Sequence, residues 1–87
     1  MTLNFPNKSR YYDTRRRGVL FSGHDSVIEA SFFVGEDALM RIQPDLRLDE
    51  AGLLAAFDAN RDLIYAAGSR VYARGRKDIY YLMSGDF

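Results

Sequence analysis

The chain has 87 residues, of which 47% are hydrophobic, and its 12 basic and 12 acidic residues give a formal net charge of zero. This length predicts one domain, residues 1–87, with room for one sheet and two helices but little for a deep catalytic cleft. The absence of cysteine excludes disulfide bonds and thiolate metal sites, and because the sequence shows neither a signal peptide nor a membrane-spanning apolar run, we expect a cytoplasmic protein that does not enter a membrane.

The N-terminal part of the chain carries the alternating apolar and β-branched patterns that are typical of short strands. We expect strands at residues 2–5, from Tyr11 onward and at 19–21, with connecting turns at 13–18 and 22–26. Both turn stretches contain glycine and short polar residues, which favour turn geometry. Connections of this length predict antiparallel hairpins.

The longest predicted strand covers residues 27–34. Because successive side chains of a strand point to opposite faces, one set faces the core and the other faces away from it. The inward set is Ile28, Ala30, Phe32 and Val34, and the outward set is Val27, Glu29, Ser31 and Phe33.

A short helix and a long helix follow this strand. The short helix starts at Glu36 and ends before Pro44, because proline disfavours helical geometry at the residue that precedes it. Residues 49–71 carry an apolar stripe at helical spacing behind Asp49, a good N-cap, and predict one continuous amphipathic helix. Residues 79–82 predict a last strand.

This order of elements predicts an α+β fold. We expect a small antiparallel sheet of three to five short strands, hairpins first, with one short and one long helix packed on one face.

Two polar residues, Asn60 and Arg61, lie toward the buried face of the predicted long helix. A buried amide needs hydrogen-bond partners, since leaving it unpaired costs about 1–3 kcal/mol. We interpret the pair as a polar anchor in which Asn60 binds loop backbone and Arg61 reaches an acid such as Asp25 or Glu29. The alternative is a pair that contacts a ligand.

Several features in this order resemble one protein family. They are Phe5 near the start, Tyr12-Asp13, Val19-x-Phe21, and the run at residues 57–64. The pattern resembles the domain of unknown function 1488, a family of short uncharacterised proteobacterial proteins, over nearly the whole chain. The resemblance implies a small cytoplasmic α+β domain, and it implies no activity and no catalytic or binding residues.

No group of residues in the sequence forms a convincing catalytic or metal site. His24, Asp25 and Ser26 are the residue types of a hydrolase triad, but neighbours in a turn cannot place nucleophile, base and orienting acid in line. The sequence has one histidine and neither a P-loop nor a dinucleotide-binding fingerprint. We predict no catalytic residue, no cofactor and no metal ion, and we regard a small enzyme as the least favoured function.

The outward face of the sheet is the first candidate binding surface, because two helices can cover only one face. It would carry Leu20, Val27 and Phe33, with one residue from each of the tyrosine pairs 11–12 and 80–81. Apolar patches of this kind mark protein interfaces. We therefore favour a non-enzymatic interaction or regulatory module that binds a protein partner or a second copy of itself. Alternatively, residues 3–5 and the C-terminal tail fold over this face.

Basic residues give a second candidate surface, since they concentrate near the two ends of the chain. The residues are Arg15, Arg16 and Arg17 in the first segment, 8–17, and Arg74, Arg76 and Lys77 in the second, 70–77. With the neighbouring tyrosines they could form one basic patch of a nucleic-acid accessory protein. The zero net charge makes this the alternative rather than the favoured prediction.

Overall fold

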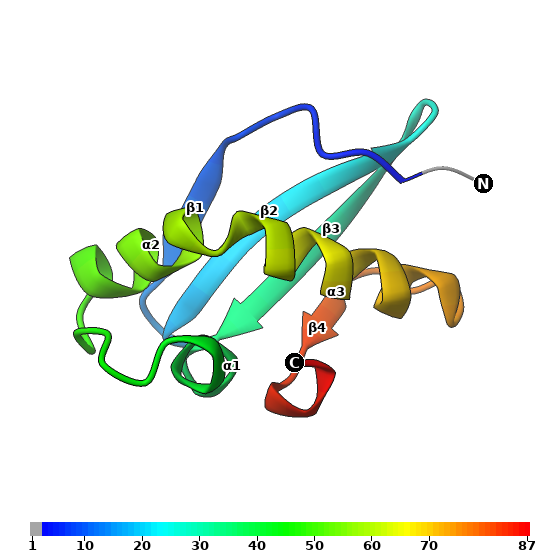
Figure 1. Cartoon of the computed structure of the whole chain (residues 1–87). Helices are drawn as coiled ribbons and strands as arrows, with labels where there is room; N and C mark the ends of the chain where they lie inside the picture. The colour runs from blue at the N-terminus through cyan, green and yellow to red at the C-terminus, as the bar shows by residue number, and fades with distance from the viewer. Residues whose placement is uncertain (1–2) are drawn as a thin grey trace.

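The computed structural model describes residues 3–87 and shows an α+β architecture, which confirms the predicted fold class (Figure 1). One sheet has the strand order β1-β2-β3-β4, with β1 (Arg10–Asp13), β2 (Gly18–Asp25), β3 (Ile28–Gly35) and β4 (Tyr80–Leu82). The helices are α1 (Glu36–Ile42), α2 (Glu50–Ala59) and α3 (Arg61–Ala73), and a short 3₁₀ helix, η1 (Ser84–Asp86), follows β4. Within residues 3–87, none of the helices has the length and apolar character that crossing a bilayer requires.

The first three strands pair through hairpins and are antiparallel, as predicted, whereas β4 pairs with β3 in parallel. A parallel pair needs a long crossover, and the helices between β3 and β4 provide it. Of the strand predicted at residues 2–5, Thr2 lies outside the described residues. Residues 3–5 form a single bridge, in which Asn4 and His24 exchange backbone hydrogen bonds of 2.8 and 2.7 Å. The N-terminal segment therefore lies beside the C-terminal end of β2.

The turn predicted at residues 22–26 is wrong, because β2 continues to Asp25 and the turn is confined to Ser26 and Val27. Gly23 serves a close approach instead of a turn. A β-carbon on Gly23 would lie 2.8 Å from Cε1 of Phe5, so a side chain there would displace the N-terminal segment. Glycine is favoured both in turns and where another segment approaches closely. Only the packing of Phe5 against Gly23 shows which of the two applies here.

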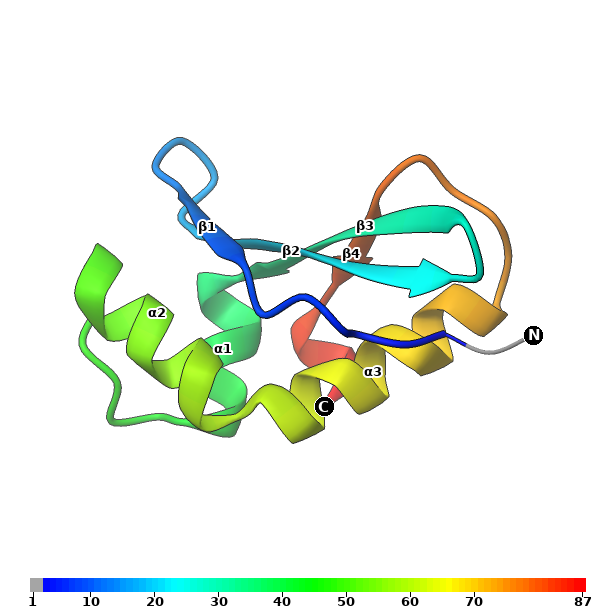
Figure 2. The ribbon, with the colours of Figure 1, turned by 90° about the horizontal axis from the view of Figure 1, so that it is seen from above.

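The three helices lie on one side of the sheet, and the hydrophobic core fills the space between the two layers (Figure 2). The sheet supplies the inward set as predicted, except that Ile28, at the hairpin end, is 44% exposed. The largest fully buried side chains are Tyr80, Phe32, Phe57, Leu39, Leu53, Ile64, Leu82, Val19 and Val34.

The segment expected to form one continuous helix is divided at Asn60 into α2 and α3, so that prediction is wrong in its continuity. Asn60 has φ −123° and ψ 25°, and its side-chain amide donates to the Ala56 carbonyl at 2.8 Å. Asparagine side chains compete in this way with backbone hydrogen bonds, which explains the interruption. Both helices still contribute buried residues to the one core.

Asp49 caps the N-terminus of α2, as predicted. Its Oδ1 accepts a hydrogen bond from the Gly52 N–H at 2.7 Å. That bond, together with Arg47, whose guanidinium lies 2.7 Å from Oδ2, holds the pKa of Asp49 below its usual value.

Asp49→Ala is expected to lower the melting temperature at neutral pH, because the charged cap is lost. A depressed folded-state pKa stabilises the protein above the unfolded pKa of about 3.9, and this contribution disappears as the pH falls through the folded-state pKa. The melting temperatures of wild type and variant should therefore converge in acid, measured by circular dichroism from pH 7 downward. Asp45→Ala is the control, and a gap that does not depend on pH would contradict the prediction.

Candidate functional site: the open face of the sheet

The face of the sheet opposite the helices carries a row of side chains that crosses all four strands. In the strand register Tyr11 lies opposite Leu20, Leu20 opposite Phe33, and Phe33 opposite Tyr81. We call this face the open face and these four residues the cross-strand row. Tyr11 and Tyr81, at its two ends, are 68% and 44% exposed.

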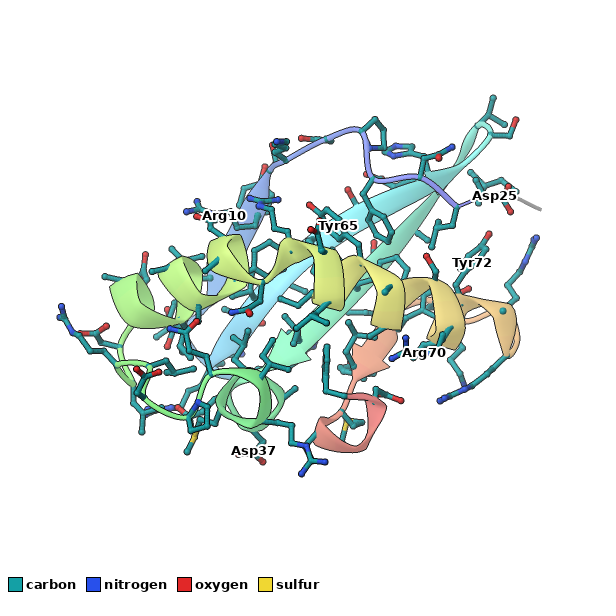
Figure 3. The ribbon with its side chains drawn as sticks, viewed as in Figure 1. Arg10, Asp25, Asp37, Tyr65, Arg70 and Tyr72 are labelled. Carbon is teal, nitrogen blue, oxygen red and sulfur yellow. The ribbon has the colours of Figure 1, made fainter. Side chains whose placement is uncertain are left out.

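Residues 3–5 and the C-terminal tail do not cover the open face, so the alternative that they fold over it is wrong. Phe5 lies on the helix side, stacked on Tyr65 with ring centroids 4.2 Å apart. At the other end, Arg70 of α3 donates to the Asp86 carbonyl at 2.6 Å. Figure 3 shows Tyr65 and Arg70 on α3. Both described ends of the chain are therefore engaged in the helix layer.

The predicted apolar patch of Leu20, Val27 and Phe33 is not continuous. Phe33 is only 8% exposed, because the Arg16 guanidinium lies 5.9 Å from its ring centroid and the Tyr81 ring lies 5.8 Å away. Val27 is 94% exposed, but it belongs to the β2–β3 turn and lies beyond the cross-strand row. The exposed part of the row is therefore mainly tyrosine.

The two basic segments do not form one patch. Arg15, Arg16 and Arg17, which we call the turn arginines, connect β1 to β2, whereas Arg74, Arg76 and Lys77 lie between α3 and β4. The end of α3 is fixed to the C-terminal end of β2, where the Tyr72 hydroxyl donates to Asp25 at 3.0 Å (Figure 3). The two segments thus lie at opposite ends of the sheet. Figure 2 shows both connections rising on the side of the sheet that the helices leave uncovered.

The turn arginines differ in how they are held. Arg16 donates to the Tyr81 hydroxyl at 3.3 Å and lies 3.7 Å from an Asp13 carboxylate oxygen. Arg17 forms a 2.9 Å ion pair with Glu36. Arg15 is exposed. Arg16 therefore adds a fixed positive charge beside Phe33 and Tyr81, at the β4 end of the cross-strand row.

A hollow of about 340 Å³ adjoins the cross-strand row on the open face. Its polar lining includes Ser22, Ser31 and Glu29, and Tyr11 and Leu20 contribute from the row. Ser22 and Ser31 lie opposite each other in the register. The hollow therefore combines an aromatic ring, two hydroxyl groups and a carboxylate.

The predicted anchor residues, Asn60 and Arg61, bind partners within the protein. Asn60 donates to the Gln43 side chain at 2.9 Å, in addition to its bond to Ala56, instead of to loop backbone. Arg61 pairs with Asp58 at 2.7 Å, not with Asp25 or Glu29, and lies 4.9 Å from the Phe57 ring centroid. Arg10 and then Arg61 hold the pKa of Asp58 below its usual value. These contacts place the pair in the joint between α2 and α3.

Asn60→Ala is expected to lower the free energy of unfolding by about 1 kcal/mol, because it removes hydrogen bonds from a partly buried amide. Binding at the open face should not change. Urea denaturation measures the first effect and titration with a ligand of the open face measures the second. Asp62→Ala on the exposed side of α3 is the control, and loss of binding with unchanged stability would refute the structural role.

The geometry separates the residues of the hydrolase-like triplet. His24 and Asp25 are successive strand residues and point to opposite faces. His24 Nε2 lies 4.0 Å from Glu29 Oε2 on the open face, whereas Asp25 accepts the Tyr72 hydroxyl bond and raises the pKa of Tyr72. Within residues 3–87, no three histidine or acidic side chains lie close enough together to hold a metal ion.

Comparison with known proteins links the sequence to one family. A family model described as a protein of unknown function, DUF1488, matches residues 3–83. No curated protein and no solved structure matches the chain.

Proposed function

The chain belongs to the DUF1488 family, and we propose that it is a non-enzymatic binding module that holds single-stranded nucleic acid on the open face of its sheet. The observation that carries this proposal is the position of the cross-strand row between two basic segments. Single-strand binding proteins combine aromatic platforms with positive charge in the same way.

The exposed tyrosines provide the stacking surface. Tyr11 and Tyr81 lie on the two edge strands, with Leu20 and the covered Phe33 between them. Stacking of one base on an aromatic side chain contributes about 1–3 kcal/mol and tolerates any base. A strand that crosses the sheet can therefore contact both rings.

The charges fit a polyanion at the ends of the open face. The turn arginines lie at one end and Arg76 and Lys77 near the other, whereas residues 18–69, which include α1, α2 and most of α3, hold nine acids against three basic residues. With zero net charge, the protein has no general attraction for DNA or RNA. Phosphate contacts should therefore be few and local.

The favoured prediction from the sequence was a protein partner or a second copy of the chain. It depended on an apolar patch that included Phe33, and the near-complete burial of Phe33 leaves a smaller and more polar surface. Static light scattering should therefore give the monomer mass in the absence of nucleic acid. A dimer that Leu20→Glu dissociates into folded monomers would instead assign the open face to a second copy.

Fluorescence anisotropy with a labelled single strand and its duplex tests the proposal. The single strand should bind more tightly, because its bases are free to stack. If the protein neutralises two or three phosphates, its affinity for the single strand should fall roughly 10-fold between 50 and 200 mM salt. Equal affinity for the duplex, or no binding at low salt, would contradict the proposal.

A further inference from the structure

We propose that the hollow on the open face holds an unpaired guanine of the bound strand, an inference that rests on the proposed function. The hollow has a volume of about 340 Å³, which lies at the lower end of the roughly 300–1,000 Å³ typical of small-ligand sites. It adjoins the cross-strand row, so a base that enters it lies next to Tyr11 and Leu20.

Glu29 is the residue that distinguishes the bases. Its side chain is 61% exposed and its carboxylate, when ionised, only accepts hydrogen bonds. Guanine presents two adjacent donors, N1–H and the 2-amino group, which match the two carboxylate oxygens. Uracil and thymine present one donor between two carbonyl oxygens, and these oxygens repel a carboxylate. Adenine and cytosine each present one donor group beside an acceptor nitrogen.

The serine hydroxyls complement this recognition. Ser22 and Ser31 face each other across β2 and β3, two register positions from His24 and Glu29 and therefore on the same face. Hydroxyl groups both donate and accept, so they can bind the guanine O6 and ring nitrogens. The floor of the hollow thus supplies donors and acceptors where the base edge would lie.

The separation of charge on the open face agrees with a base at this position. A carboxylate repels phosphate, and Glu29 is remote from the turn arginines, since the Ser22–Ser31 and Leu20–Phe33 pairs lie between them in the register. The phosphates of a bound strand would contact the turn arginines, while one base turns toward the carboxylate. Glu29 lies at the end of the sheet that also carries Arg76 and Lys77, so it selects a base without opposing the phosphate contacts at the turn arginines.

Oligonucleotides that differ at one base test this inference. The strands carry guanine, adenine or cytosine at the centre of an otherwise thymine sequence, with RNA counterparts in uracil, and anisotropy gives the affinities. Bidentate recognition predicts a preference of about 10-fold for guanine. Inosine, which lacks the 2-amino group, should lose most of this preference, whereas 7-deazaguanine, which keeps both donors, should retain it.

Glu29→Gln provides the matched test in the protein. It should reduce the guanine-to-thymine affinity ratio to about one, and Glu50→Gln on α2 should leave the ratio unchanged. A ratio of one in the wild type, or a preference that survives Glu29→Gln, would overturn the guanine site while the nucleic-acid function stands. Failure of every strand to bind would overturn both proposals.

Discussion

Replacement of both Tyr11 and Tyr81 with alanine is expected to weaken the binding of a single-stranded oligonucleotide by at least about 30-fold. Each ring offers one stacking platform, and the loss of two platforms at about 1 kcal/mol or more each gives this factor. Both residues are already exposed, at 68% and 44%, so the fold should survive. Fluorescence anisotropy measures the affinity, and circular dichroism measures the folding of the variant.

Leu63 and Met40 provide the matched control, because they are comparably exposed, at 54% and 38%, but lie on the helices. Their double replacement with alanine should leave binding within twofold of the wild type. Equal losses in both double variants would indicate a non-specific effect and would remove the open face as the binding surface.

Phe57→Ala is expected to lower the free energy of unfolding by about 3–5 kcal/mol, the range for removal of a fully buried aromatic side chain. Phe57 lies on α2 with its ring centroid 5.1 Å from that of Phe21 on β2, so it connects the two layers. It also lies beneath the Arg61 guanidinium. A domain of this size has a total stability on the order of 5–15 kcal/mol, so this loss should bring it close to unfolding.

Urea denaturation of the variant measures this loss, with Leu63→Ala as the exposed control. Leu63→Ala should change the free energy of unfolding by less than about 1 kcal/mol. A small effect of Phe57→Ala would mean that α2 does not pack on the sheet as described.

The features that the sequence predicted well have local causes. The start of α1 at Glu36 and its end before Pro44 follow from the nearest residues, as does the cap at Asp49. The alternation along β3 identified most of the core-facing residues, because one face of a strand is buried and its register admits no slip.

The features that the sequence did not predict depend on contacts between distant residues. In the sequence Gly23 indicates a turn, whereas in the structure it makes room for Phe5, which packs against it. Asn60 fits the helical pattern by its spacing, and its amide binds not only Ala56 within α2 but also Gln43, which lies in the connection before α2. The distant partners, Phe5 and Gln43, cannot be identified from the local pattern.

The binding surface was predictable only in outline. Alternation showed that one member of each tyrosine pair faces outward, but the register was needed to select Tyr11 and Tyr81. The burial of Phe33 depends on Arg16 of the β1–β2 turn, seventeen positions earlier in the chain. The hollow beside Glu29 has no sequence signal, because its residues come from separate strands.

Mapping of backbone amide chemical shifts by nuclear magnetic resonance tests most directly whether the open face binds single-stranded nucleic acid. On titration with a short oligonucleotide, the largest shifts should fall on Tyr11, Leu20, Ser31 and Tyr81, with smaller shifts in the turn arginines. Amides on the outer surface of α2 and α3 should not move. Shifts confined to these helices, or the absence of shifts at low salt, would contradict the assignment of the open face as the binding surface.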